Sequence, residues 1–129
     1  MSEKQKLLIV DDSELNRDIL KEILGSSYDY LAAENGTQAI QILEVHPEID
    51  LMLLDINMPQ MNGFQVLEHM RELQWIDEIP VVMISSEESV EIMRKAYDLG
   101  ITDYISRPFD AVIVKKRVQN TLGLYANQK

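Results

Sequence analysis

Residues 51–55 read LMLLD, a short run that is apolar on both faces and ends in the carboxylate of Asp55. A strand that buries only one face alternates apolar and polar side chains, whereas an unbroken apolar run is typical of a strand covered on both faces. Residues 7–10 (LLIV) form a second such run, which leads directly into Asp11 and Asp12. Both runs therefore predict buried strands of a sheet that is covered on both faces.

Outward from these two runs, strand-like and helix-like segments alternate along the chain. Strands are predicted at residues 7–10, 28–33, 51–54, 81–84 and 103–106. Apolar residues at helical spacing predict a helix after each strand, and the first of these is capped by Ser13 and stopped by Gly25. Leu15 belongs to the apolar pattern of the first helix, and Val90 and Tyr97 to that of the fourth. The alternation predicts a parallel α/β sheet within one domain over residues 1–129.

The composition argues against several classes of function. The net charge is −10, from 22 acidic and 12 basic residues, whereas direct nucleic-acid binding needs a basic surface. No apolar run approaches the roughly 20 residues of a membrane span, and the polar residues 1–6 do not resemble a secretory signal. The chain has no Cys, so disulfides and thiolate metal sites are excluded. We expect a cytoplasmic protein.

Polar side chains follow four of the predicted strands, and in such sheets the working site lies outside the carboxyl ends of the strands. They are Asp11, Asp12, Asp55, Ser85 and Arg107. Three carboxylates at one edge would repel one another unless a cation lay between them. Oxygen ligands suit Mg²⁺, with Mn²⁺ as the alternative, and zinc fits poorly because the chain lacks Cys and its two His do not sit at strand ends.

A carboxylate beside a divalent cation can also act as a nucleophile toward phosphorus and form an aspartyl phosphate. In that chemistry the hydroxyl of Ser85 would donate to one phosphoryl oxygen and the cation of Arg107 would bind another. The pattern therefore points to phosphoryl transfer onto Asp55.

Four segments together resemble the receiver domain of two-component response regulators, in the family's order and spacing over about residues 7–122. They are LIVDDS at residues 8–13, LLDINMPQMNG at 53–63, IPVVMIS at 79–85 and RPF at 107–109. The resemblance implies a flavodoxin-like (βα)5 three-layer sandwich with parallel strand order 2-1-3-4-5, the order that receivers share with flavodoxin.

The resemblance also implies residue roles. Asp55 resembles the phosphoacceptor, Asp12 a direct metal ligand and Asp11 a ligand acting mostly through water. The backbone carbonyl of Asn57 would complete the protein ligands of the metal. Ser85 resembles the switch hydroxyl.

Two further residues carry roles implied by the family near the end of the chain. Tyr104 resembles the aromatic residue that changes rotamer as Ser85 moves toward the phosphate. The bond before Pro108 resembles the family's cis peptide, which an X-Pro bond tolerates at low cost.

The sequence departs from the family at one site residue and leaves two others open. The family pattern has Lys where this chain has Arg107, so we predict that phosphorylation survives with altered kinetics or coupling. Asn57 stands where related aspartyl-phosphate hydrolases place an acid, and Asn cannot serve as a general acid or base. Glu87 resembles a position that tunes phosphate lifetime, but a charge favoured in the first turn of a helix explains it equally well.

The leading hypothesis is a phosphoacceptor module, not a turnover enzyme, fed by a histidine kinase or a phosphotransfer protein. Its output would be a shift of the surface formed by the fourth helix, fifth strand and fifth helix, a possible dimer interface. Two alternatives stay open: an Mg²⁺-dependent phosphohydrolase that uses Asp55, and an interaction module that is never phosphorylated. Residues 115–117 (KKR) are expected on a solvated helix face, with partner docking as a minority interpretation. Residues 123–129 either end the protein or begin a linker to an output domain of hydrolase or cyclase type.

Overall fold

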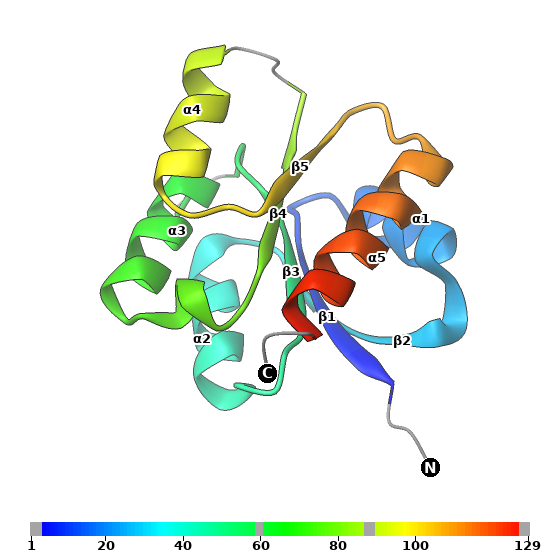
Figure 1. The fold of residues 1–129 in the computed structure, drawn as a ribbon, viewed down its shortest axis with the longest axis horizontal. Coiled ribbons are helices and arrows are strands. Elements are labelled where there is room, and N and C mark those ends of the chain that lie inside the picture. Colours follow the sequence, from blue (N-terminus) through cyan, green and yellow to red (C-terminus); the bar gives the residue numbers. More distant parts are fainter. Residues whose placement is uncertain (1–3, 59–60, 87–89, 127–129) are drawn as a thin grey trace.

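The computed structural model describes residues 4–58, 61–86 and 90–126 of the chain, and its strands and helices alternate as the sequence predicts (Figure 1). The elements are β1 (Gln5–Val10), α1 (Glu14–Leu24), η1 (Gly25–Ser27), β2 (Tyr28–Ala33), α2 (Gly36–Val45), β3 (Leu51–Asp55), α3 (Gly63–Glu72), η2 (Trp75–Asp77), β4 (Val81–Ser85), α4 (Val90–Asp98), β5 (Asp103–Ser106) and α5 (Ala111–Ala126).

The five strands form one parallel sheet in the order β2-β1-β3-β4-β5. This confirms the predicted flavodoxin-like fold and its strand order. Every residue of β3 and of β4 is buried, which agrees with their unbroken apolar sequences. The edge strands β2 and β5 are only partly buried.

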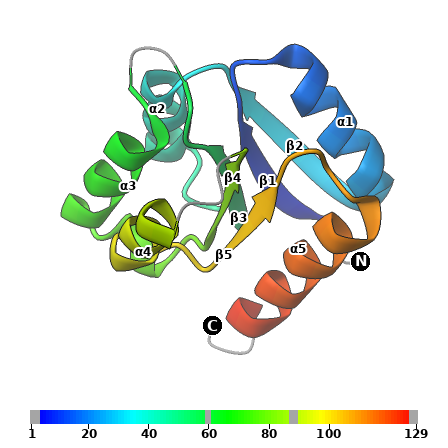
Figure 2. The same ribbon diagram turned by 90° about the horizontal axis from the view of Figure 1, so that it is seen from above.

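Two helical layers cover the sheet, and Figure 2 shows α1 and α5 on one face and α2, α3 and α4 on the other. Alternate residues of each strand feed the two cores. Leu53 packs with residues of α1 and α5, whereas Leu54 packs with residues of α2, α3 and α4. The helices cover the two faces of the sheet. The loops after the carboxyl ends of the strands carry polar residues such as Asp12 and Arg107.

Two expectations about apolar faces are wrong. Leu15 is 68% exposed, so the core contact of α1 comes from Leu20 and Leu24. In α4, Val90 is 66% and Tyr97 45% exposed, and Ala96 is the buried residue. The helical spacing placed the helices correctly, but it could not tell which of the apolar residues face the sheet.

The carboxyl ends of the central strands are aligned by the register of the sheet. Val10 pairs with Leu54, and Asp55 pairs with Ile84. Ser85 follows Ile84 and pairs with Ser106 of β5. The residues that follow β1, β3, β4 and β5 therefore meet at one edge.

No helix in the described part of the chain combines the length and the apolar character that crossing a membrane requires.

Candidate functional site

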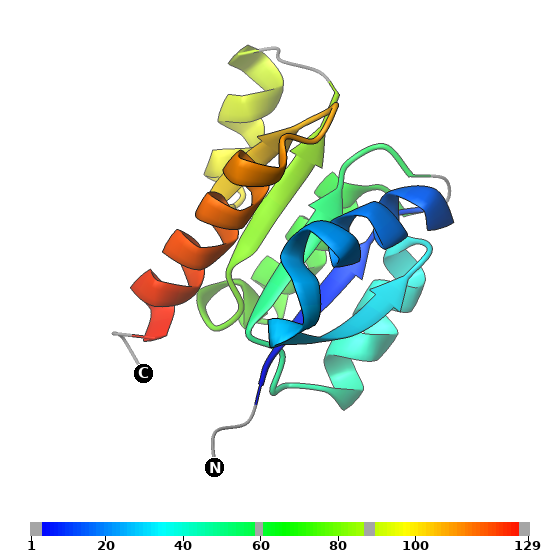
Figure 3. The same cartoon turned by 90° about the vertical axis from the view of Figure 1, so that its right-hand side faces the viewer.

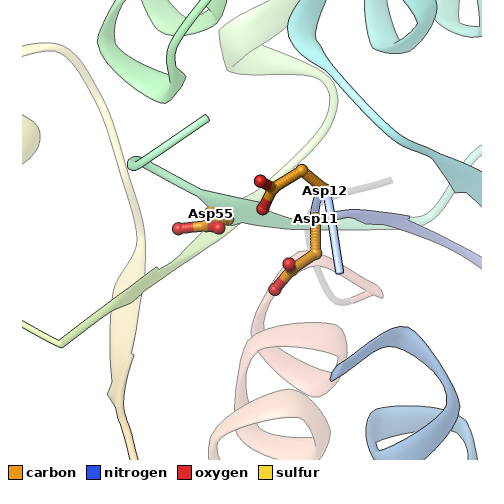
Figure 4. A group of neighbouring side chains, drawn as sticks. All are labelled: Asp11, Asp12 and Asp55. Carbon is orange, nitrogen blue, oxygen red and sulfur yellow. The ribbon is translucent and has the colours of Figure 1, made fainter. Parts of the chain in front are cut away.

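Three carboxylates lie together at the ends of β1 and β3 (Figure 4). Asp11 and Asp12 follow the last residue of β1, and Asp55 is the last residue of β3. One oxygen from each lies within 4.8 Å of the others. The sequence predicted this meeting, because parallel strands bring their carboxyl ends to the same edge.

Two of the three carboxylates are buried and are held by backbone amides. Asp11 is 0% and Asp55 1% exposed, whereas Asp12 is exposed to solvent. The amide of Ser13 donates to Oδ1 of Asp11 at 2.9 Å, and the amide of Asn57 donates to Oδ1 of Asp55 at 3.0 Å. Each carboxylate is thus fixed by the turn that follows it, before any ligand binds.

A single nitrogen of Arg107 bridges the two buried carboxylates. Its Nη2 lies 2.7 Å from Oδ2 of Asp11 and 3.0 Å from Oδ2 of Asp55. The Nε of Arg107 is buried and has no hydrogen-bond partner among the described residues. The single positive charge of the guanidinium therefore offsets only part of the charge of the two carboxylates, and its Nε donor stays unused among the described residues.

Burial and neighbouring charges shift the pKa values of Asp55 and Arg107. Burial raises the pKa of the Asp55 carboxyl above its usual value, and the charge of Asp11 acts in the same direction. The Asn57 amide and Arg107 oppose the rise. Burial acts against the charge of Arg107, but its hydrogen bonds and attraction to Asp55 and Asp11 prevail, so the pKa of Arg107 is raised.

Ser85 lies at the same edge of the sheet as this cluster, and Tyr104 lies farther back in the sheet. Ser85 ends β4 and is 3% exposed. Its carbonyl oxygen accepts a hydrogen bond from the backbone amide of Arg107 at 3.1 Å. Tyr104 pairs with Met83, two residues before Ser85. Ser85, Arg107 and the carboxylates therefore share one edge of the sheet. Tyr104 lies two residues before Ser106 along β5.

Of three other predicted positions, the structure describes Asn57 and Pro108 but not Glu87. Asn57 is exposed in the loop after β3, and its amide contacts Asp55. The peptide bond between Arg107 and Pro108 is cis. Glu87 lies outside the described residues.

The loop after β3 is held close to Asp55 by Gly63. A Cβ on Gly63 would lie 2.6 Å from Cα of Ile56 and 2.8 Å from the carbonyl oxygen of Asp55. The amide of Gly63 donates to the carbonyl of Ile56 at 3.2 Å. The start of α3 therefore packs directly against the backbone that carries Asp55.

Sequence reasoning missed two arginines around the site. Arg17 donates from Nη1 to the carbonyl of Asp11 at 2.6 Å. Arg117 was expected on a solvated helix face, but its side chain is 31% exposed and contacts Asp103 and Tyr104. No local pattern in the sequence indicates either contact, because each depends on how a helix packs beside the strand that precedes it.

The oxygen-only cluster fits a hard divalent cation. Its ligands would be the carboxylates of Asp11, Asp12 and Asp55, of which the exposed Asp12 leaves one side open to water. Mg²⁺ keeps several waters and prefers one or two carboxylates, so a half-open site of this kind suits it. The arrangement combines a cation site, a buried carboxylate and a cationic side chain, as phosphoryl transfer to a carboxylate requires.

Comparisons with known proteins agree with this arrangement. The family model for the response regulator receiver domain matches residues 7–119. A chemotaxis protein, CheY1 of Helicobacter pylori, is 34% identical over 120 residues, which is 92% of this chain and 97% of that protein. The structure of chemotaxis protein CheY4 of Vibrio cholerae superposes with a TM-score of 0.84 at 27% identity, covering 92% of this chain and 99% of that one.

One relative is much longer than this chain. A probable cyclic di-GMP phosphodiesterase of Vibrio cholerae is 35% identical over 116 residues, which is 90% of this chain but 26% of that protein. The same kind of domain therefore occurs alone and as part of a larger protein.

Proposed function

The chain belongs to the response regulator receiver family, and from that premise we propose that it accepts a phosphoryl group on Asp55 and acts as a signalling switch. The observation that carries the proposal is the cluster of three carboxylates within 4.8 Å, two of them bridged by Arg107. Asp11 and Asp55 both combine burial with contact to Arg107, and Asp55, at the end of β3, is the one that resembles the phosphoacceptor of receivers.

The phosphoryl donor would be a phosphohistidine of a kinase or phosphotransfer protein. One carboxylate oxygen of Asp55 forms the new bond to phosphorus while the bond from phosphorus to the imidazole nitrogen breaks. The electron pair of that bond stays on the nitrogen, which takes a proton from solvent, and the protein keeps an aspartyl phosphate. Asp55 must be ionised to attack, so its raised pKa makes the reaction slower as the pH falls.

Asp11, Asp12 and Asp55, with the backbone carbonyl of Asn57, would hold Mg²⁺ or Mn²⁺ for this step. The bound cation would neutralise charge that develops on the transferring phosphoryl group. Asp12 is the exposed member of the three carboxylates, so the side of the cluster at Asp12 faces solvent. The phosphoryl group would reach Asp55 from that side.

Arg107 and Ser85 would bind the phosphoryl oxygens. Arg107 already touches Asp55 through Nη2 at 3.0 Å and has a buried Nε without a partner among the described residues, so its planar guanidinium would bind phosphoryl oxygens once Nη2 leaves the carboxylates. Ser85, at the end of β4, offers a hydroxyl beside the strand position that pairs with Asp55. The two residues would approach the phosphate from β5 and β4.

The output would be a population shift in the surface made by α4, β5 and α5. Movement of Ser85 toward the phosphate would let Tyr104 change rotamer, so that two pre-existing arrangements of this surface change in proportion. Asn57, which lacks acid or base function, favours a lasting phosphate over rapid hydrolysis. Glu87 stays a candidate for tuning the lifetime of that phosphate.

The partners follow from this chemistry. A histidine kinase or phosphotransfer protein supplies the phosphoryl group, and the surface of α4, β5 and α5 contacts a downstream partner or a second copy. An output domain joined after residues 123–129 is the other route, and the Vibrio cholerae relative is a longer protein of which the match covers 26%. We expect the exchange to take place in the cytoplasm.

Beryllofluoride with Mg²⁺ tests the proposal, since it mimics a phosphoryl group on a carboxylate. We expect saturable shifts of the amide resonances of residues 55, 85 and 104, and no such shifts in Asp55→Asn. Absence of any shift in the wild-type chain would contradict the proposal. Steady release of phosphate from a generic phosphate ester would instead favour a hydrolase.

A further inference from the structure

Arg117 of α5 spans the open edge of the sheet at β5. Its Nη1 lies 2.7 Å from Oδ1 of Asp103 and donates to the carbonyl oxygen of Tyr104 at 3.0 Å. The guanidinium carbon lies 4.8 Å from the centroid of the Tyr104 ring. One side chain thus contacts a carboxylate, a backbone carbonyl and an aromatic face of the same strand (Figure 3 shows α5 beside β5).

These contacts reach from one face of the sheet to the other. Val114 and Val118 of α5 pack in the core shared with α1, whereas Tyr104 packs against the core shared with α2, α3 and α4. Because β5 is the last strand of the sheet, no further strand separates the two faces there. Arg117 can therefore lie along the strand edge and stack on a ring that belongs to the opposite layer.

The geometry favours one orientation of the Tyr104 ring. A guanidinium within about 6 Å of a ring centroid attracts the ring face, and the attraction depends on where the ring points. Asp103 fixes the guanidinium, since a charged pair of this kind has a short, directed hydrogen bond. Rotation of Tyr104 away from its present position would lose the stacking contact but leave the bond to Asp103 intact.

The charges of this group also act on Tyr97 of α4. Burial raises the pKa of the Tyr97 hydroxyl, Asp103 and Tyr104 raise it further, and Arg117 lowers it. Arg117 therefore joins α5 to β5 by direct contacts, on the surface to which the proposed function assigns the output.

We propose that Arg117 is a positioning residue that holds Tyr104 in the orientation of the unphosphorylated protein and so opposes the switch. This inference rests on the proposed function, because it takes Tyr104 as the residue that moves. An exposed cation–π contact changes a rotamer equilibrium by about two- to fivefold. Loss of Arg117 should raise the population of the other rotamer by that factor and tighten beryllofluoride binding by a similar one.

The experiment uses the whole chain labelled with 3-fluorotyrosine, with the Tyr104 signal assigned by its absence in Tyr104→Phe. The variants are Arg117→Gln, which removes the guanidinium, and Arg117→Lys, which keeps the charge but loses the planar fork. Lys116→Gln is the matched control, because Lys116 is an exposed residue of the same helix and its loss changes the net charge equally. The ¹⁹F spectrum is recorded without Mg²⁺, and the beryllofluoride midpoint is then measured with Mg²⁺.

Arg117→Gln should shift the Tyr104 signal in the metal-free protein and lower the beryllofluoride midpoint, with Arg117→Lys between it and the wild type. Lys116→Gln should leave both unchanged. An unmoved Tyr104 signal in Arg117→Gln, an unchanged or higher midpoint, or an equal effect of Lys116→Gln would overturn the inference. If Arg117→Gln does not fold, the same criteria apply to Arg117→Lys.

The two proposals fail in different ways. If beryllofluoride binds the wild-type chain but Tyr104 ignores Arg117, the inference is wrong and the proposed function stands. If Tyr104 responds to Arg117 while beryllofluoride binds none of the proteins, the switch is refuted, since there is then no phosphoryl state for Arg117 to oppose.

Discussion

The Nη2 atom of Arg107 lies 3.0 Å from Oδ2 of Asp55, and the same atom also contacts Oδ2 of Asp11. Two of the three carboxylates that would hold the metal therefore already share the one positive charge of a protein side chain. A divalent cation that enters the site must compete with the guanidinium for Asp11 and Asp55. The effect of having Arg107 in place of the family's Lys should therefore show most clearly in the affinity for the divalent cation.

Replacement of Arg107 by Gln should destabilise the metal-free protein by about 2 kcal/mol, because two buried carboxylates lose their cation. Mg²⁺ should then stabilise this variant more than it stabilises the wild-type chain, since no guanidinium opposes its binding. Thermal unfolding in EDTA and in Mg²⁺ measures both effects. Equal stability of the two proteins in EDTA would show that the bridge between Asp11 and Asp55 is without consequence.

Arg107→Lys tests the departure itself. Lys keeps the charge as a compact, strongly hydrated group and cannot bridge in the same planar way. We expect tighter Mg²⁺ binding, by about three- to tenfold, and a changed rate of phosphorylation. Isothermal titration and a time course with acetyl phosphate provide the two measurements. If both quantities and the response of Tyr104 match the wild type, the idea that Arg107 alters kinetics or coupling is wrong.

Asp55→Asn should raise stability near neutral pH by about 1 kcal/mol while abolishing function. Burial raises the pKa of folded Asp55, so the folded state binds the proton more tightly than the unfolded state. The favourable contribution of Asp55 is complete below about pH 4 and is lost as the pH rises through the raised value. The gain from Asn should therefore grow with pH over that window. Urea unfolding at a series of pH values checks this, and a gain that is largest in acid would contradict it.

Gly63→Ala should destabilise the chain by about 1–3 kcal/mol, because the added methyl meets backbone atoms of Asp55 and Ile56 that cannot move aside cheaply. Gly123→Ala is the matched control. A Cβ at Gly123 has no neighbour within 4 Å, and Gly123 is exposed within α5, so Ala should stabilise by about 0.5–1 kcal/mol. Denaturant midpoints of the two variants should move in opposite directions. A neutral Gly63→Ala would mean that α3 does not press on the Asp55 loop.

Asp12→Asn should weaken Mg²⁺ binding at least about tenfold while leaving metal-free stability nearly unchanged, since Asp12 is exposed. Asp29→Asn provides the control, because Asp29 is exposed near the start of β2, at the other end of the parallel sheet. NMR titration suits the measurement. Trp75 lies in η2 before β4, away from the carboxylates, so its fluorescence is a weak reporter. Equal Mg²⁺ affinities of the two variants would remove Asp12 from the site.

The fold could be predicted from the sequence because its signals are local or regular. Unbroken apolar runs identified β1, β3 and β4, and the polar residues after them identified the edge that carries the site. Strand order came from the resemblance to receivers, since the runs alone do not distinguish possible orders.

Several side-chain contacts between elements could not be predicted. Arg107 and Asp11 are 96 residues apart, and their contact depends on how the loop after β5 turns back toward β1. Arg117 was expected in solvent because its neighbours in the sequence are basic, yet the packing of α5 on β5 places it over Tyr104. Leu15 shows the opposite error. Helical spacing placed it on the apolar face of α1, but its side chain is exposed.

Intact-mass spectrometry after incubation with acetyl phosphate and Mg²⁺ tests the central claim most directly. The wild-type chain should gain the mass of one phosphoryl group, EDTA should prevent the gain, and Asp55→Asn should show none while Asp29→Asn behaves as the wild type. A phosphoryl adduct that persists in Asp55→Asn, or a wild-type chain that never acquires one under conditions where Mg²⁺ binds, would contradict the account.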